Sequence, residues 1–253
     1  MNKNSNTYTF LYAAVLVIVV AATLSVTSIW LKKPQEQNIT TEKKLNILLS
    51  VGKGTVTDAV DDKDAYINTQ YDTYIVESFI VNGNGERMSG NAFEINMKAA
   101  YEEIKAVQQA ADNEQPTLRA NLNLPIFVCQ DDDGCLKYIL PIYGAGLWGA
   151  IWGYVALNDD FNTIYGAVFA HKGETPGLGA EIATEAFAQQ FIGKKIFEEN
   201  TFTSVKVMKG GAAKGNLHGV DAISGGTITS QGVEKMLYDC LNAYKAFLEI
   251  SKR

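Results

Sequence analysis

The fold is decided by residues 124–170, which read LPIFVCQDDDGCLKYILPIYGAGLWGAIWGYVALNDDFNTIYGAVFA. The stretch contains short runs rich in β-branched and aromatic residues, which are typical of strands. Turn-forming residues separate these runs, most clearly at Asp131–Gly134 and Asn158–Asp160. We therefore predict a hairpin followed by two more strands, with the bounds Leu124–Cys129, Leu136–Tyr143, Gly149–Leu157 and Asn162–Ala170.

The flanking sequence mixes further strands with helices. A run of β-branched and aromatic residues, followed by the turn at Asn82–Gly85, predicts a strand over Tyr74–Val81. Apolar residues at helical spacing predict three helices. Their bounds are Ala92–Ala111, with Gln115-Pro116 ending it, Ala180–Phe191 and Ser230–Ile250; a short strand is expected over Ser204–Met208. This order predicts an α+β domain with a mostly antiparallel sheet and peripheral helices, since a doubly wound parallel sheet needs regular strand–helix alternation.

A long apolar segment precedes this domain. Residues 9–31, TFLYAAVLVIVVAATLSVTSIWL, carry no charge over 23 residues, which is long enough to cross a bilayer as a helix. The apolar part of a cleaved signal peptide is usually only about 7–15 residues long. We therefore predict one N-terminal transmembrane anchor at residues 1–33, a connector and stalk at 34–64, and a soluble domain at 65–253. Within the connector, Glu42–Val51 has helical spacing and Asp58–Asp64 is expected to be an acidic loop.

Composition excludes several classes of function. The formal net charge is −6, although the first 33 residues contain three lysines and no acid, so the soluble part is acidic and unsuited to nucleic acid. The three cysteines form no Cys-x-x-Cys pair and there are only two histidines, which argues against a zinc or iron–sulfur site. Cys129 and Cys135 flank the predicted hairpin turn and are either a disulfide or two free thiols.

Three glycine-rich loops depart from ordinary turn composition, at residues 143–149, 171–179 and 221–230; we call them loops one, two and three. Loops two and three run into predicted helices, whose free N–H groups and dipoles favour an anion such as phosphate. Loop three adds four hydroxyl groups, while Trp148 in loop one and Leu178 in loop two can pack against a planar ring. Together they predict a site for a phosphorylated aromatic cofactor. The alternative is ordinary turns, with Thr229 or Ser230 as a helix N-cap.

The loops, their order and the anchor resemble the C subunits of the sodium-translocating NADH:quinone reductases over essentially the whole chain. The segments that carry the resemblance are GAGLWGAIWGYVAL at 144–157, HKGETPGLG at 171–179 and DAISGGTITSQGV at 221–233. The resemblance implies FMN attached covalently, through its phosphate, to Thr227 by a flavin transferase. Gly226 stands where this family usually has alanine, a change that leaves the acceptor hydroxyl in place.

The resemblance also implies which residues bind the cofactor. The isoalloxazine ring is expected near Leu147, Trp148, Glu174, Thr175 and Leu178, and the phosphoribityl end near Ser224, Gly225 and Gly226. The neighbouring residues Gly146, Gly177, Gly179, Ile228 and Thr229 complete the set. Lys209 is expected to offset phosphate charge, its alternative role being that of a surface lysine, and Asp221 to serve the transferase or its metal. No catalytic or metal-ligating residue of the chain itself is implied.

The implied function is that of an electron-transfer subunit in an ion-translocating NADH:quinone oxidoreductase, with other membrane subunits as partners. The resemblance places the domain in the periplasm, held by a single pass through the bacterial inner membrane. The positive-inside rule, applied to Lys32 and Lys33, gives the opposite orientation, but long domains translocate regardless of such charges. The alternatives are the G subunit of an RNF-type ferredoxin:NAD oxidoreductase, a cofactor-free membrane-tethered binding module, and a hydrolase, which lacks a clear nucleophile–base pair.

Overall fold

The computed structural model describes residues 6–55 and 60–252. The chain divides into two units, Met1–Lys43 and Lys44–Arg253. Helix α1 (Asn6–Leu49) begins in the first unit and ends in the second. Within the described residues, one helical segment, Tyr8–Leu49, is long and apolar enough to cross a membrane.

Helix α1 continues through the segment expected to be a polar connector. Pro34 lies inside the helix, where a proline removes one hydrogen bond and clashes with the preceding turn. The residues that follow it, Gln35–Gln37, include good helix formers, so the connector is helical. The predicted acidic loop Asp58–Asp64 falls partly outside the described residues, and from Lys63 the chain is helical.

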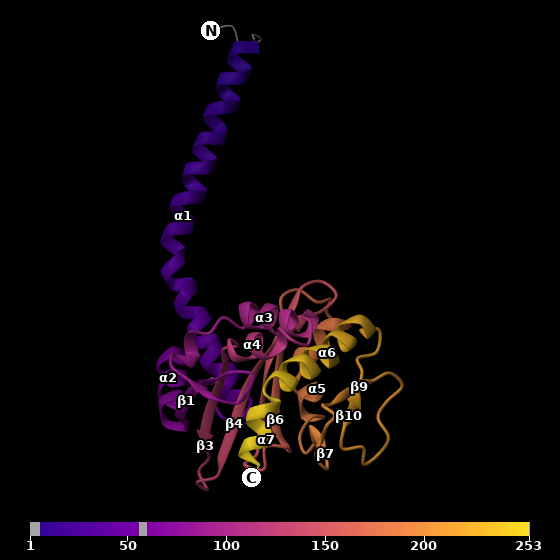
Figure 1. The fold of residues 1–253 in the computed structure, drawn as a ribbon. Coiled ribbons are helices and arrows are strands. Elements are labelled where there is room, and N and C mark those ends of the chain that lie inside the picture. The colour runs from indigo at the N-terminus through magenta and orange to yellow at the C-terminus, as the bar shows by residue number, and fades with distance from the viewer. Residues whose placement is uncertain (1–5, 56–59, 253) are drawn as a thin grey trace. The chain divides into compact units, whose positions relative to one another are not determined.

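The second unit is built on a six-stranded antiparallel sheet with the order β2-β1-β3-β4-β5-β6 (Figure 1). The strands are β1 (Ile75–Val81), β2 (Arg87–Met88), β3 (Leu124–Gln130), β4 (Leu136–Ala145), β5 (Ala150–Leu157) and β6 (Ile164–His171). The five strands predicted for this sheet are therefore confirmed, and so is the α+β class. Each hairpin turn lies where Asp, Asn and Gly interrupt the apolar runs.

The helices of this unit are α2 (Lys63–Tyr74), α3 (Met97–Gln109), α4 (Gln115–Ala120), α5 (Glu185–Gln189), α6 (Thr227–Ala243) and α7 (Lys245–Ser251). Two 3₁₀ turns, η1 (Ala92–Glu94) and η2 (Gly179–Ala183), precede α3 and α5. The helix predicted over Ala92–Ala111 is divided because the Asn96 side chain accepts from the N–H groups of Lys98 and Ala99 and so starts a new helix.

The helix predicted over Ala180–Phe191 is likewise divided, at Thr184. Its hydroxyl donates to Glu181 O (2.7 Å) and accepts from Phe187 N–H (3.3 Å), so it ends η2 and caps α5. The last predicted helix begins at Thr227 rather than Ser230 and is interrupted at Tyr244, whose buried hydroxyl donates to Pro125 O at 2.8 Å. The first two divisions therefore coincide with a polar side chain, Asn96 or Thr184, that caps the following helix.

The sheet is covered by apolar side chains on both faces, because successive residues of a strand point to opposite sides. On β3, Ile126 and Val128 belong to one buried cluster, and Phe127 and Cys129 to another. The first cluster contains the apolar faces of α3 and α6, which both pack against β4 (Figure 1). This packing fixes the start of α6 beside the end of β4, where loop one begins.

Two small sheets follow η2 and α5. Strands β7 (Phe197–Glu198) and β8 (Thr201–Phe202) form a short hairpin. The strand predicted over Ser204–Met208 is β9 (Lys206–Met208), which pairs in parallel with β10 (Gly219–Asp221). Strand β10 leads directly into loop three.

All three cysteines are free thiols. Cys129 is buried and pairs across the hairpin with Lys137, while Cys135 is exposed in the turn. Of the two alternatives for Cys129 and Cys135, the structure has free thiols, because the hairpin register does not place them opposite each other. Burial raises the pKa of the Cys129 thiol to about 11.

Candidate functional site

The three glycine-rich loops meet around one cavity of about 410 Å³, a volume in the range of small-molecule sites. Loop one joins β4 to β5, loop two follows β6, and loop three joins β10 to α6. The lining residues come from all three: Leu147, Trp148, Glu174, Thr175, Leu178, Gly179, Gly225, Gly226, Thr227, Ile228 and Thr229. All of them belong to the set of cofactor-binding residues expected from the sequence.

The four hydroxyl groups of loop three differ in their accessibility. Thr229 and Ser230 are buried. The Thr229 hydroxyl donates to Glu174 Oε2 at 2.5 Å, and Ser230 Oγ accepts from Ile223 N–H at 3.0 Å. Ser224 and Thr227 are exposed, and of these two only Thr227 lines the cavity. Thr227 is therefore the hydroxyl of this loop that is open to modification from the cavity.

Thr227 is the first residue of α6, and Gly226 is its N-cap. Because glycine has no side chain, it cannot cap the helix, and among the described residues no side chain caps the first-turn N–H groups. These N–H groups and the helix dipole favour a negative charge at this end of the helix. The position of Thr227 thus suits attachment of a phosphate.

Loop three lies directly against loop two, and this close approach depends on glycine. Gly225 has a φ of 73°, in the left-handed region that favours glycine. A Cβ atom there would lie 2.6 Å from Leu178 Cδ2. At Gly226, where the family resemblance expects alanine, a Cβ atom would lie 3.0 Å from Ile223 Cγ2, so an alanine requires a small shift of Ile223.

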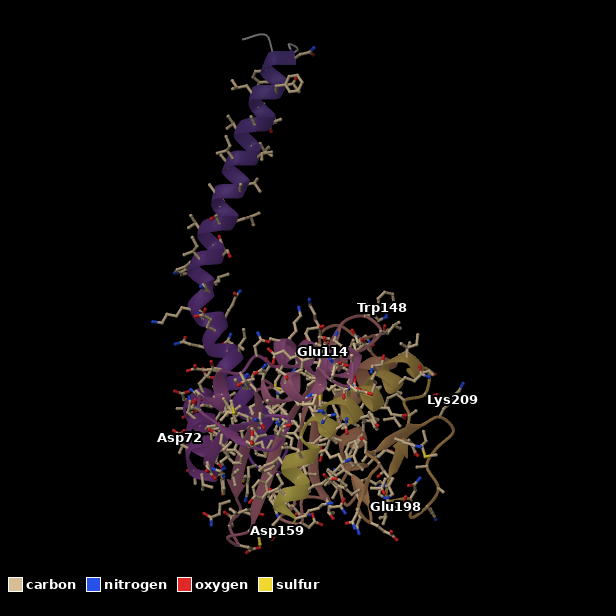
Figure 2. All side chains as sticks on the ribbon, in the orientation of Figure 1. Asp72, Glu114, Trp148, Asp159, Glu198 and Lys209 are labelled. Carbon is tan, nitrogen blue, oxygen red and sulfur yellow. The ribbon has the colours of Figure 1, made fainter. Side chains whose placement is uncertain are left out.

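Four apolar side chains of the cavity are exposed: Leu147, Trp148, Leu178 and Ile228. Trp148 is 67% exposed and projects outward from loop one (Figure 2). Grouped exposed apolar side chains mark a binding surface in a soluble domain. A planar ring placed in the cavity would remove part of this surface from water.

Glu174 differs from its neighbours in loop two because its side chain is only 4% exposed. Its Oε1 accepts from Trp148 N–H at 2.8 Å, and its Oε2 accepts from the Thr229 hydroxyl. Its own N–H donates to Nδ1 of His171 at 3.1 Å. The sequence assigned no role to His171, and no local signal marks a histidine as a partner for a backbone N–H three residues later.

Four of the expected cofactor-binding residues lie outside the cavity lining: Gly146, Gly177, Ser224 and Lys209. Lys209 is exposed on the loop after β9, at the edge of the domain in the view of Figure 2. Asp221 is also exposed, and its Oδ1 accepts from Ala212 N–H at 2.6 Å. The sequence pattern therefore identifies the loops that meet at the cavity without distinguishing the residues that line it from their neighbours.

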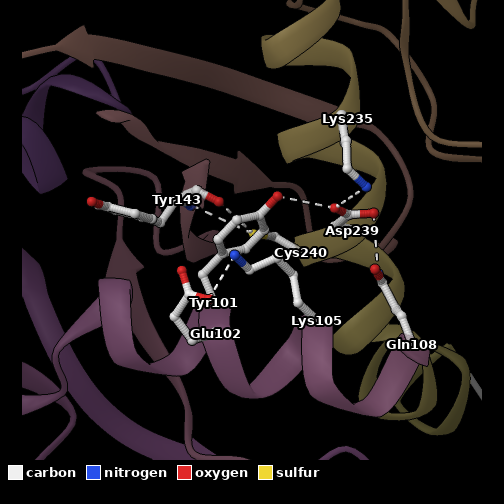
Figure 3. A network of polar contacts seen from close by, with 8 residues as sticks. All are labelled: Tyr101, Glu102, Lys105, Gln108, Tyr143, Lys235, Asp239 and Cys240. Atoms are coloured by element: carbon white, nitrogen blue, oxygen red, sulfur yellow. Dashed lines mark hydrogen bonds and ion pairs between the residues drawn. The ribbon is translucent and has the colours of Figure 1, made fainter. Parts of the chain in front are cut away.

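A polar network centred on the buried Asp239 holds α3 against α6 (Figure 3). Asp239 on α6 is 3% exposed and accepts from Tyr101 Oη (3.1 Å) and Gln108 Nε2 (3.1 Å) and pairs with Lys235 Nζ (2.8 Å). Burial, and then the charge of Asp239, raise the pKa of Tyr101 above its usual range. The network fixes the body of the helix that carries Thr227.

Cys240 connects the same helix to the start of loop one. Its thiol donates to Tyr143 O at 3.4 Å, and Tyr143 N–H donates to the sulfur at 3.5 Å (Figure 3). Burial raises the pKa of the Cys240 thiol to about 12, so this contact involves a neutral thiol at neutral pH. Loop one and α6 are thus joined behind the cavity.

Known proteins match the chain over the same region. Residues 146–242 match the FMN-binding domain family. The C subunit of the Na(+)-translocating NADH-quinone reductase of Vibrio vulnificus is 33% identical over 222 residues, which is 87% of this chain and 84% of the relative. Among solved structures, the corresponding C subunit from Parabacteroides distasonis has a TM-score of 0.71 and 42% identity, covering 86% of this chain and 96% of that one. Shewanella oneidensis NqrC has a TM-score of 0.65 and 26% identity, covering 84% and 97%.

Proposed function

The chain belongs to the family of C subunits of the Na(+)-translocating NADH-quinone reductases, and on that premise we propose that it is a flavoprotein with FMN covalently attached to Thr227. The observation that carries the proposal is the state of the loop-three hydroxyls. Thr227 is exposed and lines the cavity, whereas Thr229 and Ser230 are buried and hydrogen-bonded. A transferase acting from the cavity side therefore meets the Thr227 hydroxyl.

The residues around the cavity fit the two chemically different parts of FMN. The N-terminus of α6, with its uncapped N–H groups, suits the phosphoester. Gly225 and Gly226 leave space next to it that a Cβ atom would reduce. The exposed faces of Leu147, Trp148, Leu178 and Ile228 suit the isoalloxazine ring. Lys209 is exposed and outside the cavity lining, so it would contribute only long-range charge to the phosphate.

When bound, FMN supplies the electron-transfer chemistry, and the protein binds, orients and tunes it. The Thr227 ester keeps the cofactor on the protein in either oxidation state. Loops one and two hold the ring side of the cavity, and the polar network around the buried Asp239 keeps α6, and with it Thr227, in place. The chain then serves as an electron-carrying subunit of an oxidoreductase complex.

The partners follow from the same proposal. The N-terminal segment at residues 1–33 anchors the chain in the bacterial inner membrane by a single pass, supported by the apolar segment of α1. The domain lies on the periplasmic side. The other membrane subunits of the translocating NADH-quinone reductase complex donate and accept the electrons. A flavin transferase reads loop three during maturation, with the exposed Asp221 as one element that it recognises.

The test uses the full-length chain, co-expressed with a flavin transferase and separated on a denaturing gel. The wild type should give a band with flavin fluorescence, and Thr227→Val should give a dark band of equal protein content. Ser224→Ala is the matched control, because it removes the other exposed hydroxyl of loop three and should leave the band fluorescent. A fluorescent Thr227→Val band, with the flavin surviving denaturation, would refute the attachment.

A further inference from the structure

The side chain of Glu174 joins all three glycine-rich loops. It belongs to loop two, its Oε1 accepts from the backbone of Trp148 in loop one, and its Oε2 accepts from Thr229 at the end of loop three. These partners lie 26 and 55 residues away along the chain. Both partner groups are on segments that line the cavity. One carboxyl group thus holds together three segments that are far apart in the sequence.

Two glycines make room for this arrangement. A Cβ atom at Gly146 would lie 2.6 Å from Glu174 Oε1. A Cβ atom at Gly179 would lie 2.6 Å from Glu174 Oε2 and 2.5 Å from Thr229 Oγ1. These distances are far shorter than an ordinary carbon–oxygen contact. Gly146 and Gly179 are therefore explained by the buried carboxyl group of Glu174.

We propose that Glu174 is a positioning residue that sets the ring-binding loop and the flavin attachment point in one fixed arrangement. Thr229 lies in the first turn of α6, two residues after Thr227, so holding Thr229 fixes the helix backbone that carries the Thr227 side chain. Holding the Trp148 N–H fixes the loop-one backbone from which the exposed indole extends. The inference rests on the proposed function, since it assigns the carboxyl group to the protein framework around the flavin.

The experiment compares full-length variants co-expressed with a flavin transferase. Glu174→Ala removes both contacts and should lower covalent labelling about tenfold or more, because small misplacements of a reacting group cost up to about 10²-fold in rate. Any flavin attached to it should show lower fluorescence anisotropy in the folded protein. Glu174→Gln retains an acceptor for Trp148 N–H and can donate to Thr229 once that hydroxyl turns. It should restore labelling and anisotropy most of the way.

Glu185→Ala is the matched control, because Glu185 is an exposed glutamate of α5 that is not part of the cavity lining. It should label as the wild type does. Wild-type labelling and anisotropy in Glu174→Ala would overturn the proposal, and so would a Glu174→Gln variant no better than Glu174→Ala. The proposed function is tested separately by the denaturing gel of Thr227→Val. A dark band supports attachment of FMN to Thr227 whatever the role of Glu174, and a fluorescent band refutes that attachment.

A second pair of variants decides the matter if Glu174→Ala does not fold. Thr229→Val keeps the volume of the side chain but removes the hydroxyl that Glu174 accepts from, and Thr229→Ser keeps that hydroxyl. Reduced flavin anisotropy in Thr229→Val with recovery in Thr229→Ser supports the positioning role. Equal anisotropy in the wild type and both variants overturns it.

Discussion

Replacing Gly179 by alanine should destabilise the domain, because the new side chain would collide with the hydrogen-bonded pair Glu174 and Thr229 while Thr227 stays unchanged. The added Cβ atom would lie 2.5 Å from Thr229 Oγ1 and 2.6 Å from Glu174 Oε2, and both atoms belong to buried side chains. Overpacking of this kind costs about 1–3 kcal/mol. Loss of the hydrogen bond between them leaves a buried acceptor, at a further cost of about 1–3 kcal/mol.

The two contributions together lower the free energy of unfolding by about 2–6 kcal/mol, which for a domain of this size lowers the melting temperature by roughly 5–20 °C. Thermal unfolding of the full-length chain in detergent, followed by circular dichroism, measures this. Gly173→Ala is the matched control from the same loop, because nothing lies within 4 Å of its Cβ position. It should melt within a few degrees of the wild type, since such a change alters stability by only about 1 kcal/mol. Equal melting temperatures for the two variants would refute the packing described for Glu174.

Three further changes test other parts of the structure. Tyr101→Phe should lower the free energy of unfolding by about 1–2 kcal/mol near neutral pH, because it removes a hydrogen bond to buried Asp239. Because the pKa of Tyr101 is raised in the folded protein, its contribution to the free energy of unfolding is complete below about pH 10 and is lost as the pH rises further. The difference in unfolding free energy between wild type and Tyr101→Phe, measured with denaturant, should therefore become smaller above about pH 10. A difference in unfolding free energy that does not change with pH would contradict the hydrogen bond from Tyr101 to Asp239. Tyr244→Phe should lower the free energy of unfolding by about 1–2 kcal/mol in the same assay at any pH below about 10, because Pro125 O loses its buried donor. Trp148→Ala should change stability by less than about 1 kcal/mol, because the indole is exposed, yet lower the anisotropy of the bound flavin.

The sheet could be predicted from the sequence because its signals are local. The strands β3 to β6 alternate with turns whose residues, such as Asp131–Gly134, stop a strand whatever surrounds it. Helix α2 is not predicted, because it lacks such a local signal. It has no apolar stripe and buries only Ile67, although Asp62 caps its first turn. The parallel pairing of β9 with β10 was also missed, since it joins distant residues and has no local pattern.

The site divides in a similar way. Glycines, hydroxyl residues and the side chains of Trp148 and Leu178 indicate the three loops in the sequence, and the structure brings these loops to one cavity. The burial of Glu174 could not be predicted, because a glutamate in a loop is usually exposed. Its position depends on the space left by Gly146 and Gly179, which lie in two different loops. Nor could the sequence distinguish Thr227 from Thr229 by accessibility, since that difference arises from the side of α6 on which each residue sits.

Attachment of FMN to Thr227 can be measured by mass spectrometry of the tryptic peptide spanning residues 215–235, taken from the chain made with a flavin transferase. This peptide contains all four hydroxyl residues of loop three, Ser224, Thr227, Thr229 and Ser230. We expect this peptide to be heavier by the mass of FMN less one water, with the added mass located on Thr227 by fragmentation. An unmodified peptide, or the same increase located on Ser224, would contradict it.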